Sequence, residues 1–207
     1  MILFFLQSSS ELGPSACMPA ADQVFSPGAA HLAGLLALVL TVDGSNLHPE
    51  WKLNLHFLYG TYHREGGLSF KLNSTGKIGE VLGDIPDAAF DSKVSEPLRP
   101  DFSSMELVAA RSNDMKDSSR NEMDCEKLYD LYKKVCPEAL WMSWLGPDSL
   151  PYWYQHPEWP ICPETRSSMH FVGQISAEVF SRDLPDCGIY LFYSPESSVQ
   201  TLIYQST

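Results

Sequence analysis

The side chains that most often carry out chemistry in proteins are scattered along this sequence. None of its histidines stands in a His-x-x-x-His or helical Glu-His pair, and Cys162 has no second cysteine two or four residues away. A zinc site needs three or four such ligands at workable spacing. We therefore expect no metal, no cofactor and no catalytic residue that the sequence alone can name. The histidines are His31, His48, His56, His63, His156 and His170.

Nucleophilic chemistry has little support in the sequence. A cysteine nucleophile needs a base and an orienting group, which meet only in the folded chain. A pair of Cys162 and His170 is conceivable, but two packed core residues would give the same pattern. No Gly-x-Ser-x-Gly motif indicates a serine hydrolase. The segment Gly76-Lys77-Ile78-Gly79 is too short for a phosphate-binding loop.

Carboxylates are easier to find. Asp84, Asp87 and Asp91 recur at short spacing within the acidic stretch Glu80–Glu126. Two carboxylates can act as general acid and base where burial separates their pKa values, but such a cluster is more often a solvated face or a partner surface. We expect these three aspartates to be the first contacts with a protein partner.

The segment Tyr152-Trp-Tyr-Gln-His-Pro-Glu-Trp-Pro160 is unusually rich in rings. Rigid aromatic side chains make good binding surfaces. They also fill the core beneath an irregular loop rich in proline, and we favour this second interpretation. If the first holds, a pocket near Trp153, Trp159 and Gln174 is the place for a ligand.

The charge of the chain limits its partners. The net charge is −12, from 26 acidic and 14 basic residues. Such a field repels phosphate backbones and anionic membranes, so we expect neither nucleic-acid binding nor membrane binding. It attracts a basic protein, with faster association at low salt. An acidic surface can also serve only to keep a protein soluble.

The cysteines and the apolar runs favour a cytoplasmic protein. The cysteine number is odd and the spacing fits no disulfide framework, which indicates reduced thiols. No Lys or Arg precedes Lys52, so the apolar start lacks the positive region of a signal peptide. The apolar run Ala29–Val42 is shorter than the roughly 20 residues of a membrane span. The cysteines are Cys17, Cys125, Cys136, Cys162 and Cys187.

Periodicity predicts several strands in the first half. Lys52–Tyr62 and Leu68–Leu72 alternate between apolar and polar residues, and glycines separate them, so we expect a hairpin. The run Met1–Leu6 is typical of a buried strand. Ala29–Leu40 is ambiguous, because its start favours a helix and its end favours a strand.

The second half begins after a polar stretch. Residues 111–123 offer almost nothing to bury and are predicted to be a flexible connection. Asp124 can cap a helix over 124–136, because apolar residues follow at spacings of three and four. We expect this helix to pack on three strands, at 169–175, 189–193 and 199–204.

Three motifs follow in order near the end of the chain. The loop Trp144-Leu-Gly-Pro-Asp-Ser-Leu-Pro151 comes first, then Trp159-Pro160 and the strand segment Met169–Ile175, and last Leu184-Pro-Asp-Cys-Gly-Ile-Tyr-Leu-Phe-Tyr193. In these motifs residues 141–204 resemble the YwqG-like family, a widespread group without an assigned activity. The resemblance implies a two-lobed α+β fold rich in antiparallel sheet, and it brings no catalytic signature.

Together these patterns predict an α+β protein with two lobes, built of mainly antiparallel β-sheet and a few short helices. The lobes are residues 1–110 and 124–207, joined by the linker 111–123. We expect a non-enzymatic acidic binding protein, such as an inhibitor or immunity-type protein that captures a basic partner such as a toxin. The alternative is a small-molecule-binding protein or enzyme with an aromatic-lined pocket between the lobes.

Overall fold

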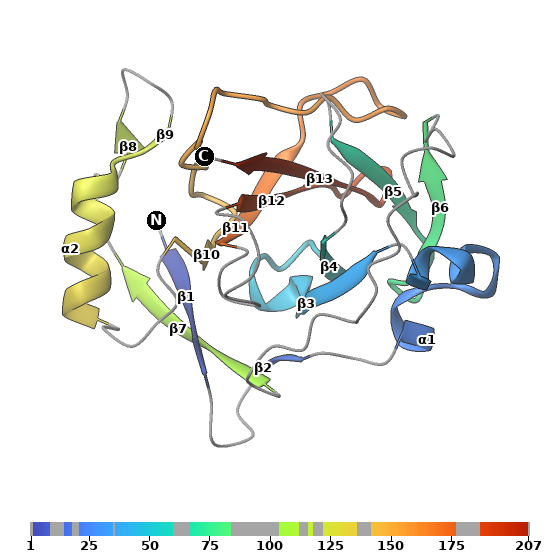
Figure 1. Ribbon diagram of the computed structural model, residues 1–207, viewed down its shortest axis with the longest axis horizontal. Coiled ribbons are helices and arrows are strands. Elements are labelled where there is room, and N and C mark those ends of the chain that lie inside the picture. Colours follow the sequence, from blue (N-terminus) through green and yellow to red (C-terminus); the bar gives the residue numbers. More distant parts are fainter. Residues whose placement is uncertain are drawn as a thin grey trace.

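Figure 1 shows the computed structural model of the chain. It describes residues 2–8, 15–17, 21–34, 36–59, 67–83, 104–111, 116–117, 122–135, 142–176 and 187–206. The strands in these ranges are β1 (Ile2–Ser8), β2 (Ser15–Cys17), β3 (Ala37–Asp43), β4 (Asn54–Tyr59), β5 (Leu68–Leu72), β6 (Ile78–Leu82), β7 (Ser104–Arg111), β8 (Lys116–Asp117), β9 (Glu122–Met123), β10 (Trp144–Leu145), β11 (His170–Ser176), β12 (Cys187–Ser194) and β13 (Val199–Ser206). The helices there are α1 (Ala21–Val24), α2 (Cys125–Val135) and the 3-10 helices η1 (Pro27–Gly34) and η2 (Gly44–Asn46).

In the described ranges, eleven strands form one sheet in the order β4-β3-β2-β7-β1-β10-β11-β12-β13-β5-β6, and β8 and β9 form a separate ladder. All of these neighbouring strands are antiparallel. The predicted class, a β-rich α+β fold with mainly antiparallel sheet, is therefore confirmed. Strands from both halves of the chain are neighbours, since β1 pairs with β10 and β13 with β5. The division into two lobes stays a prediction.

Most of the predicted strands are present. The apolar start of the chain forms β1, and the three strands predicted near the end are β11, β12 and β13. The ambiguous segment Ala29–Leu40 divides as its two ends suggested, with η1 at the start and β3 at the end. None of the described helices is long and apolar enough to cross a membrane.

The predicted hairpin between Lys52–Tyr62 and Leu68–Leu72 is wrong. β4 pairs with β3, whereas β5 lies between β13 and β6. Alternation decides which side chains of a strand are buried, but it does not decide which strand is the neighbour. Gly67 permits the pairing of β5 with β13. At its φ of +72° a Cβ atom would collide with the carbonyl oxygen of Leu202.

Both faces of the sheet are covered around β12, and all eight of its residues are buried. Ile189 and Leu191 point into the main core, together with apolar side chains of β3, β4 and β5. Tyr190 and Phe192 point to the opposite face, where they pack with Trp153, Cys162 and Met169. Polar groups on this strand and its neighbours must therefore find partners inside the protein.

β4 is the last strand at one end of the described sheet. Side chains of β13 form hydrogen bonds with the backbone groups on its open edge. Gln200 accepts a hydrogen bond from the His56 N–H through Oε1, and its Nε2 donates to the His56 carbonyl, both at 3.1 Å. The Tyr204 hydroxyl donates to the Leu58 carbonyl at 2.9 Å. An open strand edge would leave buried backbone groups without partners. These bonds therefore fix β4 against β13.

The imidazole of His56 is buried between two polar groups. Its Nδ1 lies 2.9 Å from the Thr41 hydroxyl, and its Nε2 lies 2.7 Å from the Gly76 carbonyl. A carbonyl only accepts, so Nε2 carries the proton and Nδ1 accepts from Thr41. Burial lowers the pKa of His56 to about 4, although the hydrogen bond to Gly76 opposes this shift. The ring is therefore neutral at pH 7.

Helix α2 begins directly after Asp124, as predicted. The Asp124 carboxylate accepts from the backbone N–H of Lys127 at 3.2 Å, and this bond lowers the pKa of the carboxyl group. The helix packs through Leu128 against Leu3 of β1 and Trp144 of β10. The expectation that it packs on the strands at 169–204 is therefore wrong, because the buried residues that cluster with Leu128 come from β1, β7, β9 and β10.

We expect acid to destabilise the protein through His56. The unfolded chain takes up a proton on this ring below about pH 6.5, whereas the folded chain does so only near pH 4. The free energy of unfolding therefore falls as the pH decreases from about 6.5 to 4. The pKa difference corresponds to about 3 kcal/mol. Urea unfolding at a series of pH values measures it.

The variant His56→Gln isolates this effect from the titration of carboxylates. It is less stable at pH 7 but loses less further stability between pH 6.5 and 4.5 than the native chain. His31→Gln is the control, because His31 is exposed. If the native and His56→Gln proteins lost the same stability between pH 6.5 and 4.5, protonation of His56 would not be the cause of the acid destabilisation.

Candidate functional site

The three aspartates predicted to contact a partner lie outside the described residues. The structure describes this part of the chain as far as Gly83, which follows β6. Asp84 is the next residue, and Asp87 and Asp91 come a few positions later. Their placement as a contact surface stays a prediction.

The structure brings Trp153 and Trp159 together. Their ring centroids are 6.2 Å apart, and the Trp153 ring stacks on Tyr190 with centroids 4.9 Å apart. Phe192 completes the cluster, with its centroid 5.3 Å from Trp159. Only 6 % of Trp153 is exposed. The two tryptophans thus cover one face of β12.

Gln174 lies beside this cluster on β11, opposite Tyr190 of β12. Its Oε1 accepts from the backbone N–H of Tyr152 at 3.0 Å. The Tyr190 hydroxyl donates to the Tyr152 carbonyl at 2.9 Å and accepts from the Tyr154 N–H at 3.1 Å. Burial raises the pKa of Tyr190, so the hydroxyl keeps the proton that it donates.

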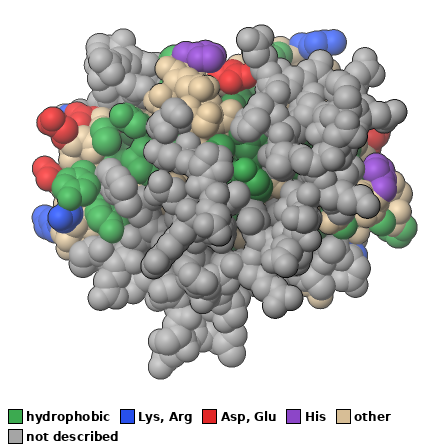
Figure 2. Space-filling model, in the orientation of Figure 1, with side chains coloured by type: hydrophobic (Ala, Val, Ile, Leu, Met, Phe, Trp, Pro, Cys, Tyr) green, Lys and Arg blue, Asp and Glu red, His purple; other side chains and the backbone are tan. Residues whose placement is uncertain are grey.

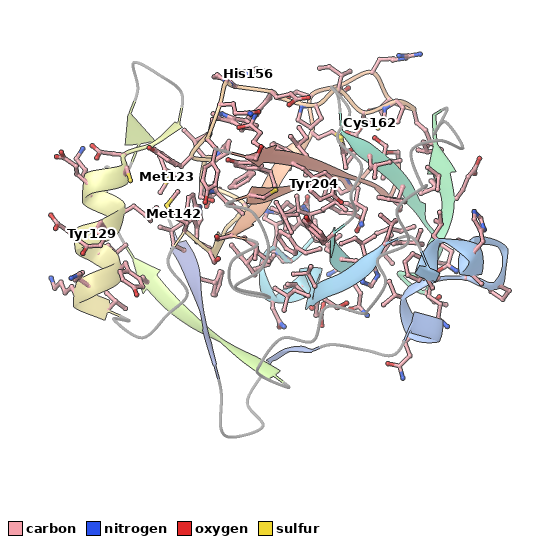
Figure 3. The ribbon with its side chains drawn as sticks, in the orientation of Figure 1. Met123, Tyr129, Met142, His156, Cys162 and Tyr204 are labelled. Carbon is pink, nitrogen blue, oxygen red and sulfur yellow. The ribbon has the colours of Figure 1, made fainter. Side chains whose placement is uncertain are left out.

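A third side chain, from β13, completes the attachment of this segment. Gln205 accepts from the Gln155 N–H at 3.1 Å and donates to the His156 carbonyl at 2.7 Å. The segment from Tyr152 to His156, near the top of Figure 3, is therefore held by one side chain from each of three adjacent strands. Sequence reasoning identified Gln174 but missed Tyr190 and Gln205. A glutamine in a strand that otherwise reads as buried is the signal that could have indicated Gln205.

Cys162 lies on the same face as the aromatic cluster and is completely buried. Burial by itself raises the pKa of its thiol. Hydrogen bonds from the Ser197 hydroxyl, from the Thr165 side chain and from the backbone N–H groups of Thr165 and Glu164 outweigh burial and lower that pKa to about 7. The Ser197 oxygen is 3.3 Å from the sulfur.

No base accompanies this thiol among the residues that the structure describes. The suggested partner His170 is exposed and lies near Trp51, with ring centroids 6.3 Å apart, on the side of the main core. In the described part of the chain, no histidine is hydrogen-bonded to Cys162. A lowered thiol pKa favours the reactive thiolate, but complete burial closes the sulfur to reagents. The contacts of Cys162 therefore stabilise the turn at residues 162–167.

Neither a metal-binding group among the described residues nor a known relative indicates a reaction or ligand for this region. Among the residues that the structure describes, no group of three His, Cys, Asp or Glu side chains could hold a metal ion. Comparisons of the chain with protein-family models, with curated proteins and with solved structures find no match. The resemblance of residues 141–204 to the YwqG-like family therefore stays a prediction from the motifs.

We expect Tyr190→Phe to loosen the aromatic segment. The substitution keeps the ring but leaves the Tyr154 N–H without an acceptor and the Tyr152 carbonyl without a donor. Each group left unpaired costs about 1–3 kcal/mol. Urea unfolding is expected to show a loss of about 2 kcal/mol or more, and chymotrypsin is expected to cleave the segment faster.

Tyr59→Phe is the matched control. Tyr59 is also buried and its ring also contacts a tyrosine, but no backbone group of the described residues bonds to its hydroxyl. The same small loss of stability in both variants would show that the Tyr190 hydroxyl does not hold the segment.

Proposed function

We propose that this chain is a non-enzymatic acidic binding protein of the cytoplasm. In this proposal it captures a basic protein, as an inhibitor or immunity-type protein captures a toxin. The observation that carries the proposal is the net charge of −12 on 207 residues. A charge of this size accelerates the encounter with a basic surface and repels acidic competitors.

The charge is concentrated in one part of the sequence. The stretch Glu80–Glu126 contains 12 acidic and 5 basic residues, so its net charge of −7 is more than half of the total. The contact surface is proposed to lie on this stretch, with Asp84, Asp87 and Asp91 first. A nuclease groove that binds a phosphate backbone is positive, and it is the kind of surface that such a stretch would complement.

Helix α2 is a poor candidate for the contact surface. Its acidic side chains alternate with basic ones, and Figure 2 shows red and blue side chains together at the left edge, where this helix lies. Three carboxylates there are balanced by three amines, and the Asp124 carboxylate is paired with Lys127. The charged residues of this region are Asp124, Glu126, Lys127, Asp130, Lys133 and Lys134.

A second candidate function is a small-molecule-binding protein or enzyme. Its pocket would be lined by aromatic rings near Trp153 and Trp159, between the two predicted lobes. The observation in its favour is that the side-chain nitrogen of Gln174 is buried without a hydrogen-bond partner among the described residues. An unpaired donor beside aromatic rings is typical of a ligand site.

The partner is sought with the full chain as bait. We expect a column of the protein to retain a basic protein from an extract of its own cells at low salt, and a salt gradient to release it for mass spectrometry. Replacing Asp84, Asp87 and Asp91 by Asn is expected to weaken binding of that protein about tenfold at low salt, since three exposed pairs contribute roughly 0.5 kcal/mol each. The salt dependence becomes shallower.

The control carries the same change of charge elsewhere. Glu50→Gln, Asp148→Asn and Glu196→Gln alter three exposed side chains outside the acidic stretch. If both triple variants bind the released protein equally well at every salt concentration, the proposed contact residues are wrong. If no basic protein is released by salt, the proposed function itself is wrong.

A further inference from the structure

Two buried residues that face each other across the ladder of β10 and β11 carry hydrogen-bond donors without an acceptor among the described residues. The indole Nε1 of Trp144 and the amide Nε2 of Gln174 have no hydrogen-bond partner in the part of the chain that the structure describes. Both residues are 0 % exposed. They are also direct cross-strand partners in the ladder of β10 and β11. Opposite residues of an antiparallel pair point to the same face, with Cβ atoms about 5 Å apart.

The direction of the Gln174 amide is fixed. Its Oε1 accepts from the Tyr152 N–H at 3.0 Å. Turning the amide round to present Oε1 to the indole would leave that backbone N–H without an acceptor, so the NH₂ group stays unpaired. Each buried donor left unpaired costs about 1–3 kcal/mol, and folded proteins rarely keep two together.

The described side chains that pack around the two donors are uncharged. Trp144 packs with Met123, Leu128 and Met142, among other apolar side chains of the cluster beneath α2. Figure 3 shows Met123 and Met142 on the side of the sheet that faces this helix. A carboxylate or phosphate placed here would lose its water without gaining a counter-charge. The loss of hydration costs a neutral oxygen much less free energy.

We propose that Trp144 and Gln174 form a binding site for one uncharged oxygen acceptor. A single oxygen has two lone pairs and can accept from both nitrogens at once. The oxygen belongs either to an internal water molecule or to the carbonyl or hydroxyl group of a small neutral ligand. The site joins the cluster under α2 to the segment that Gln174 holds. It does not depend on the proposed acidic contact surface.

The test is nuclear magnetic resonance of the ¹⁵N-labelled full chain. The spectrum contains five indole signals, and Trp144→Phe removes the one that belongs to Trp144. Should that variant not fold, through-bond correlations assign the same signal in the unaltered chain. We expect the indole proton and the Gln174 amide protons to show cross-peaks to one common species, either water or a ligand that copurifies.

Unfolding and refolding the protein in plain buffer distinguishes an internal water molecule from a bound ligand. If water fills the site, the refolded protein regains the original indole shift and melting temperature. If a ligand fills it, the refolded protein loses the cross-peaks, and its mass in native mass spectrometry is lower by the mass of the ligand. Both results support the site.

A shared acceptor also couples the two donors. Trp144→Phe is expected to abolish or weaken the cross-peak of the Gln174 amide, whereas Trp51→Phe, in the main core on the opposite face of the sheet, leaves it unchanged. The proposal is overturned if both donors contact only carbon-bound protons. It is equally overturned if a carbonyl of the chain itself accepts from them.

Discussion

The bidentate hydrogen bond between the Gln200 side chain and the backbone of His56 is the interaction on which the packing of β4 against β13 depends. It joins residues 144 positions apart in the sequence, and it supplies both partners that a neighbouring strand would have given to the backbone of His56. His56 in turn bonds to Thr41 and to the turn at Gly76 through its ring. One buried residue therefore connects β3, β4, β13 and the turn between β5 and β6.

The same principle recurs on the opposite face of the last strands. Gln174, Tyr190 and Gln205 extend from three neighbouring strands and bond to backbone groups of the segment Tyr152–His156. Strands whose faces are both buried carry mainly apolar residues. Here their few polar side chains replace the partners that irregular backbone lacks. The Trp153 ring then packs against Tyr190, with ring centroids 4.9 Å apart.

The sequence predicted local structure well and contacts between distant segments poorly. Alternation in β5 and the cap at Asp124 depend on residues a few positions apart, and both predictions are confirmed. The hairpin failed because periodicity does not distinguish β4 from β13 as the neighbour of β5. Of the candidate site, Trp153 and Trp159 do lie together, but nothing local in the sequence connects Gln174 with Trp144 or Gln205 with His156. The three aspartates come after Gly83, beyond the described part of that segment.

Hydrogen exchange at the His56 amide tests the role of Gln200 most directly. Successive backbone groups of a strand point to opposite sides, so the amide of His56 faces Gln200 while that of Phe57 faces β3. In Gln200→Met, we expect the His56 amide to exchange much faster than in the native chain, while the Phe57 amide exchanges only on global unfolding. Unchanged protection of His56 in a folded Gln200→Met protein would contradict it.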